Sequence, residues 1–246
     1  MTSRKALLTA MLVSALTAVA GTQQIATERD RREALQSYRI GIELLSGEQF
    51  EKAAEQFANA VHKDGLLTRA HYALGQSYMG LRRYASAAKA YNDCLAAFRE
   101  LHGLQQTHRF DVERQRDDEI KELHENIRRL TQAGQALRAT QAEARLRDLE
   151  RQKSTIEEAY QPPPAVLLAL GSALFRNGDV ETATRQWEAA VASDPKLGEA
   201  HNNLAVVYLL TGRSADADTA IKAAEKAGFR VNPHLKEDLK KARTRS

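Results

Sequence analysis

The residue types that carry most enzyme chemistry occur in this chain, but not at the spacings that catalysis or metal binding requires. Its seven histidines are scattered, its one cysteine has no second thiol to pair with, and HExxH, GxSxG and glycine-rich phosphate motifs are absent from the sequence. Adjacent carboxylates such as Asp117 and Asp118 point apart on a helix and cannot share a proton. We therefore expect no enzyme activity, no metal site and no cofactor.

The elements that position these residues recur at an interval of 34 residues. A small residue is followed by a leucine or aromatic residue, an alanine, a large apolar residue and a second small residue, as two packed antiparallel helices require. The first set pairs Gly41 with Gly75, Leu44 with Tyr78, Ala53 with Ala87, Phe57 with Tyr91, and Ala60 with Cys94. The second pairs Gly171 with Ala205, Leu174 with Tyr208, Ala183 with Ala217, Trp187 with Ile221, and Ala190 with Ala224.

With this period and these columns the chain resembles a tetratricopeptide repeat (TPR) protein. The resemblance implies an all-α fold of two repeat pairs, at 34–100 and 164–231, followed by a capping helix within 232–246. A glycine in each intra-repeat turn is expected to adopt the positive φ that closes a helix. These glycines are Gly47, Gly80, Gly178 and Gly212.

The repeat columns also assign the histidines and the cysteine. His71 and His201 fall at the same column of their repeats, in the first helix, where a packed imidazole is a better interpretation than a metal ligand. Cys94 falls at the column that holds alanine in the other repeats, so we expect a buried small side chain.

Residues 101–163 interrupt the repeats with an insertion that has coiled-coil spacing. One seam consists of Ile120, Leu123, Ile127 and Leu130, and a second of Ala142, Leu146, Leu149, Ile156 and Tyr160. The second seam does not continue the spacing of the first, and the break falls at 133–135. If the chain folds back there, the two seams face each other. The facing pairs are Leu130 with Leu137, Ile127 with Ala142, Leu123 with Leu146, Ile120 with Leu149, and Val112 with Ile156. This predicts an antiparallel coiled-coil hairpin with limbs of about 28 residues; the alternative is one continuous helix.

The first twenty residues have the pattern of a signal peptide. Arg4 and Lys5 precede an uncharged run, and Ala18-Val19-Ala20 forms a cleavage signal. We expect export to the periplasm or outside the cell, cleavage after Ala20, a linker or helix over 21–33, and no integral membrane span in the mature chain. An uncleaved anchor is the alternative.

The charges argue against nucleic acid as a partner. The net charge is +4, and basic and acidic residues are interspersed along the chain, so that they form no basic stripe. The locally basic C-terminal end is interpreted as a solvated helix.

In the TPR family the first helices of successive repeats line a concave groove, and this resemblance selects one face of each first helix. The predicted partner-binding residues are Tyr38, Ile42, Leu45, Tyr72, Gln76, Met79, Leu168, Ser172, Phe175, Asn202, Asn203, Val206 and Leu209. This mostly apolar face suits a helical or extended segment of another protein. The alternative is that the chain's own N-terminal helix or a second copy fills it. Asn203 matches a column where family members use asparagine to hold a peptide, but Arg39, Ala73 and Ala169 do not repeat it.

These features predict a non-enzymatic interaction scaffold of a bacterial-type cell envelope. Two alternatives stay open: an envelope assembly factor that oligomerises through its coiled-coil arm, and an accessory subunit of an enzyme complex.

Overall fold

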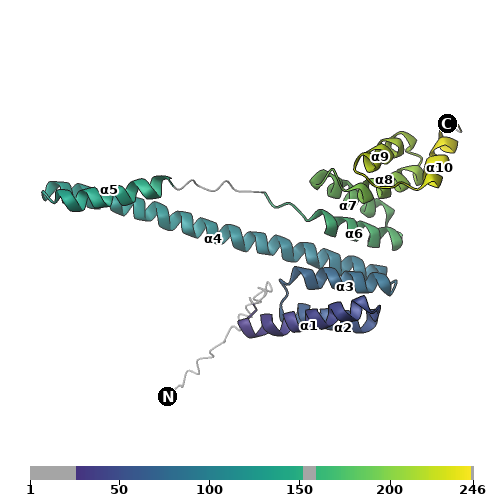
Figure 1. Ribbon diagram of the computed structural model, residues 1–246, viewed down its shortest axis with the longest axis horizontal. Helices are drawn as coiled ribbons and strands as arrows, with labels where there is room; N and C mark the ends of the chain where they lie inside the picture. Colours follow the sequence, from purple (N-terminus) through teal and green to yellow (C-terminus); the bar gives the residue numbers. More distant parts are fainter. Residues whose placement is uncertain (1–25, 152–158, 245–246) are drawn as a thin grey trace, which may run out of the picture.

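In the computed structural model, which describes residues 26–151 and 159–244, the chain is all-α (Figure 1). The described residues form ten helices: α1 (Glu28–Ser46), α2 (Phe50–Lys63), α3 (Thr68–Gly80), α4 (Tyr84–Gln132), α5 (Ala136–Arg151), α6 (Pro164–Arg176), α7 (Val180–Ser193), α8 (Gly198–Leu210), α9 (Ser214–Lys226) and α10 (Pro233–Thr244). Helices α1 with α2, α3 with the start of α4, α6 with α7, and α8 with α9 are the four helix pairs of the repeats.

A glycine in the first helix of three repeats makes room for an aromatic ring of the second helix. A Cβ added to Gly171 would lie 2.5 Å from Nε1 of Trp187, which is closer than packed atoms approach. The other two pairs are as close: Gly41 with Phe57 at 2.6 Å and Gly75 with Tyr91 at 2.5 Å. In the fourth repeat, Ala205 shares a buried cluster with the aliphatic Ile221. The 34-residue pattern thus reflects direct packing between the paired columns.

The insertion separates the two repeat pairs in sequence but not in space. Val166 and Leu170 of α6 share a buried cluster with Tyr91 and Cys94 of α4. Helix α6 therefore packs on α4 as α3 packs on α2 and α8 packs on α7. Because these contacts are continuous, the four repeats form one array, in which the start of α4 lies between α3 and α6 (Figure 1).

The turns within the repeats correct one expectation. Gly178 and Gly212 have the expected positive φ, 90° and 76°. In the first two repeats the positive φ belongs to Glu48 and Arg82 instead. Gly80 remains helical, and a Cβ there would lie 2.5 Å from the Phe50 ring, so close packing explains this glycine better than turn conformation.

The second helix of repeat two continues without a break into the insertion. Helix α4 runs for 49 residues and projects from the repeats, and α5 turns back along its outer end (Figure 1). The turn occurs at 133–135, where Gly134 has a φ of 69° and the Gln135 amide donates to the carbonyl of Leu130. Because α4 ends at Gln132, one continuous helix through the insertion is wrong.

The contacts between α4 and α5 differ in detail from the mirrored seams. Arg145 of α5 donates to Glu119 of α4, with Nε 2.8 Å from Oε1. Ala139, Ala142 and Leu149 are buried along α5. Leu137 is 75% exposed, so its expected pairing with Leu130 is wrong: the tight turn directs Ala139, rather than Leu137, to the buried side.

The length of the returning limb stays a prediction. Helix α5 is described over 16 residues, up to Arg151, where the described residues stop, so the predicted 28 residues are not tested. The expected partner of Val112, Ile156, lies outside the described residues, as does the whole predicted leader.

Helix α10 covers the last repeat. Val231 and Leu239 are buried in the cluster formed by α8 and α9, and Arg243 pairs with Asp218 of α9, with Nη2 2.9 Å from Oδ2. The polar outer face of such a helix shields the final apolar surface of a repeat array.

Candidate partner-binding groove

The thirteen predicted partner-binding residues lie on the first helices of the repeats, α1, α3, α6 and α8. Eleven of them are half-buried, while Ile42 and Gln76 are exposed. Half-burial is what a groove wall requires, because a fully buried side chain cannot reach a ligand. Seven of the thirteen also pack against the buried core clusters: Tyr38, Leu45, Tyr72, Met79, Leu168, Phe175 and Leu209.

The structure gathers four of the predicted residues around one pocket between α6, α7 and α8. Ser172 and Phe175 of α6 line it together with Asn203 and Val206 of α8. Its volume is about 430 Å³, enough for the side chains of a short peptide segment rather than for a single atom or ion.

Three further residues line this pocket that were not predicted. Trp187 forms its floor and packs on Phe175, with ring centroids 5.6 Å apart. Arg176 and Glu199 add charge. Glu199 could have been found, because it lies three residues before Asn202 and seven before Val206, which is the spacing of one helix face.

Some polar side chains of the pocket form hydrogen bonds within the chain, and others do not. The Ser172 hydroxyl donates to the carbonyl of Leu168 at 2.9 Å, and the Trp187 indole donates to the same carbonyl at 3.2 Å. By contrast, the Asn203 amide and the Glu199 carboxylate form no hydrogen bond or ion pair with other described residues. These two groups are therefore available to a ligand.

Tyr72 of α3 lies where the first repeat pair meets α6. Burial raises the pKa of its phenol, with smaller contributions from Cys94 and Glu199. Tyr72 packs against the buried cluster to which α6 contributes Val166, Leu170 and Ala173. Tyr72 is also held by Tyr91, whose ring centroid lies 5.5 Å away.

Cys94 does not contribute to a reactive site. It is fully buried, its thiol donates to the carbonyl of Thr68 at 3.3 Å, and burial raises its pKa to about 12. A thiol in this environment stays protonated and is a poor nucleophile. Its interpretation as a buried small residue agrees with these contacts.

The two equivalent histidines have the same structural role. Nε2 of His71 lies 2.9 Å from the carbonyl oxygen of Gly65, and Nε2 of His201 lies 3.0 Å from that of Pro195. Each imidazole thus stabilises the loop that precedes its repeat. Within 26–151 and 159–244, no group of three histidine, cysteine or acidic residues could hold a metal ion.

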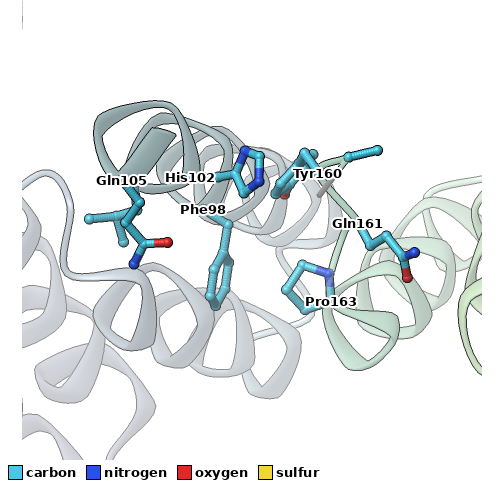
Figure 2. A pocket seen from close by; sticks show the side chains of 8 residues that line it. Phe98, His102, Gln105, Tyr160, Gln161 and Pro163 are labelled. Carbon is cyan, nitrogen blue, oxygen red and sulfur yellow. The ribbon is translucent and has the colours of Figure 1, made fainter. Parts of the chain in front are cut away.

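A second pocket lies at the base of the arm, which consists of α5 and residues 100–132 of α4, where the chain returns to the repeats (Figure 2). Phe98 and His102 of α4 line it, and His102 faces Tyr160. The Tyr160 hydroxyl donates to the carbonyl of Leu95 at 3.2 Å. The Tyr160 and His102 ring centroids are 5.6 Å apart. Tyr160 therefore anchors the returning chain at the base of the arm. It does not belong to the second seam, because the prolines at 162–164 favour extended backbone before them.

The family model of the tetratricopeptide repeat matches residues 38–100 and 168–228, which together are half of the chain. The chain therefore belongs to the TPR family. The unmatched stretch between the two ranges contains the projecting part of α4 and all of α5. No curated protein matches the chain.

The chain is also similar to solved structures at low sequence identity. The chain is similar to MamA, with 12% identity, 81% of each chain covered and a TM-score of 0.52. It is also similar to PilW, a type IV pilus biogenesis factor, with 14% identity, 85% of each chain covered and a TM-score of 0.40. YrrB, a TPR protein with an unusual peptide-binding site, has 18% identity, with 87% of this chain and 95% of YrrB covered, and a TM-score of 0.31.

The TPR fold is typically a non-catalytic scaffold, and its partners are peptides or proteins. In the part of the chain that the structure describes, no helix is long and apolar enough to span a membrane.

Proposed function

We propose that this chain is a non-enzymatic adaptor that holds a mainly apolar segment of another protein in the groove formed by α3, α6 and α8. The pocket beside Phe175 and Val206 carries this proposal, because it combines apolar walls with the polar groups of Asn203 and Glu199, which bond to no other described residue. Apolar area supplies affinity for a peptide, and a few polar groups fix its position.

The groove is best tested at residues that contribute little to the core. Tyr72 and Phe175 pack on Tyr91 and Trp187, so truncating them would also weaken the fold. Replacing Asn203 and Val206 by arginine instead fills the pocket from its rim.

We expect Asn203→Arg with Val206→Arg to abolish partner capture, since blocking the centre of an interface commonly costs about 2 kcal/mol or more. A photo-crosslinking residue at the exposed Gln76 would report capture in the native cell. The matched control is Asn59→Arg with Thr219→Arg, which places two arginines at exposed positions of α2 and α9. Circular dichroism checks that all variants fold. Crosslinks from Gln76 that are equally strong in the pocket variant would show that the groove is not the binding site.

We further propose that the adaptor works outside the cytoplasm. The charged start at Arg4 and Lys5, the uncharged run after it and the Ala18-Val19-Ala20 site support this proposal.

Export predicts a mature chain that begins at Gly21. Amino-terminal sequencing of the protein isolated from the envelope fraction should then read Gly-Thr-Gln-Gln. Recovery of a chain that keeps residues 1–20 and sediments with membranes would indicate an uncleaved anchor instead.

For the arm formed by α5 and residues 100–132 of α4, we propose a coiled-coil hairpin that extends the reach of the adaptor to a second partner. The buried residues Ala139, Ala142 and Leu149 of α5 support this, since their spacing is that of a seam. The ion pair between Arg145 and Glu119 supports the packing of the two limbs against each other.

The other candidate role for the arm is self-association in an envelope assembly factor. Phe110 and Val112 of α4 are 54% and 51% exposed, and such residues could pack on a second copy. Disulfide crosslinking between α4 and α5 separates the two roles.

A further inference from the structure

We propose that the α8 side of the groove binds a lysine or arginine of the partner segment, with Glu199 as its counter-charge. This inference rests on the proposed groove function and specifies the chemistry of the occupant: an apolar segment with one basic residue.

The first observation is the state of the Glu199 carboxylate. It lies on the first turn of α8 at the rim of the pocket and pairs with no described cation. Several other acidic residues of the repeats are paired: Glu33 with Lys63, Glu51 with Arg83 and Asp218 with Arg243. A ligand cation at Glu199 therefore displaces no internal salt bridge.

The second observation is the surface around this carboxylate. Phe175 and Val206 provide apolar walls, and the side-chain oxygen of Asn203 is a free acceptor on the same helix as Glu199. Lysine and arginine have apolar stems and charged ends, so they bury the stem along such walls while the end reaches polar groups at the rim. Leucine or norleucine would pack against the apolar walls but would give the Glu199 and Asn203 side chains no partner.

Arg176 restricts where the cation can bind. It also lines the pocket, but its guanidinium carbon lies 5.9 Å from the ring centroid of Tyr84, so it stacks toward α4. Its positive charge disfavours a second cation on the α6 side. The partner's basic residue is therefore directed to the α8 side, where Glu199 lies. A carboxylate in the same place would meet the charge of Glu199 and be disfavoured.

The test uses the full chain and random peptides displayed on phage, followed by synthetic peptides of the selected sequences. We expect the selected peptides to share one lysine or arginine flanked by apolar residues. Replacing that lysine by norleucine keeps the stem and removes the charge, and should weaken binding to the wild-type chain about tenfold, as measured by fluorescence anisotropy.

The lysine and norleucine peptides are then measured against variants of the chain. Against Glu199→Gln the lysine and norleucine peptides should bind equally, whereas the control Glu55→Gln, an exposed glutamate of α2, should keep the tenfold difference. Selection on Glu199→Lys should shift the enriched residue from basic to acidic.

Two kinds of failure are distinguishable. If the selected peptides lose binding in Asn203→Arg with Val206→Arg but the norleucine change has no effect, the cation site is wrong and the groove function stands. If no selected peptide depends on the groove, the proposed function fails and the cation site fails with it.

Discussion

Replacing Trp187 by alanine is expected to lower the free energy of unfolding by about 3–5 kcal/mol, the usual cost of removing a large buried aromatic side chain. Trp187 is 2% exposed, packs on Phe175 and donates a hydrogen bond from its indole to the carbonyl of Leu168. Urea denaturation followed by circular dichroism measures the loss. Fluorescence is unsuitable because this is the chain's single tryptophan.

A double-mutant cycle tests why the glycine of this repeat is required. Gly171→Ala should destabilise the fold by about 1–3 kcal/mol through overpacking, because the new Cβ would lie 2.5 Å from the indole. Adding Trp187→Ile recreates the combination of the fourth repeat, Ala205 with Ile221. The double variant should therefore be more stable than the sum of the two single changes predicts.

The matched control is Gly103→Ala on the projecting part of α4. A Cβ at Gly103 would have no neighbour within 4 Å, so alanine there should stabilise the helix by up to about 1 kcal/mol. A Gly171→Ala variant as stable as this control would show that contact with the indole does not explain the glycine.

Cysteines at Ile120 and Leu149, in a Cys94→Ala background, are expected to form a disulfide within one chain on mild oxidation. Ile120 is half-buried and Leu149 is 3% exposed, and the neighbouring pair of Glu119 with Arg145 holds the two helices together at this level. Facing positions of packed helices can bring Cα atoms within the 7 Å or so that a disulfide requires. Nonreducing electrophoresis and mass spectrometry measure the product.

The control pair is Ile120→Cys with Leu137→Cys. Leu137 is 75% exposed at the start of α5, about 12 residues or roughly 18 Å along the helix from Leu149, so it should not crosslink within the chain. If the Ile120 and Leu149 variant forms only intermolecular bonds, and these disappear on dilution, the hairpin would be wrong. The arm would then be the means of oligomerisation, in favour of an assembly factor.

The sequence was sufficient for the repeats because their signal is local and recurrent. Gly171 and Trp187 are 16 positions apart, and the same contact recurs in other repeats, so a pattern search detects it without knowing the fold. The capping helix expected within 232–246 begins at Pro233, since proline favours the first turn of a helix.

Turn conformations were less predictable, because a glycine can serve either flexibility or packing. Gly178 has the positive φ expected of it, whereas Gly80 is helical and is needed for the space it leaves to Phe50. Sequence alone does not distinguish these roles, because the contact with Phe50 comes from another repeat.

The candidate site required the tertiary structure. The helical period assigned Ser172, Phe175, Asn203 and Val206 to one face of each first helix, but it did not show that they line one pocket. It also missed Glu199, whose importance depends on having no internal partner.

What the sequence determined by itself is the repeat, its helices and the position of the turn at 133–135, because each depends on residues close together or on a repeated interval. Only the tertiary structure decided that α6 packs on α4 across the insertion, that Leu137 is exposed while Ala139 is buried, and that Tyr160 fastens the base of the arm. These features depend on how separate helices meet, and the packing of distant side chains leaves no periodic trace in a single sequence.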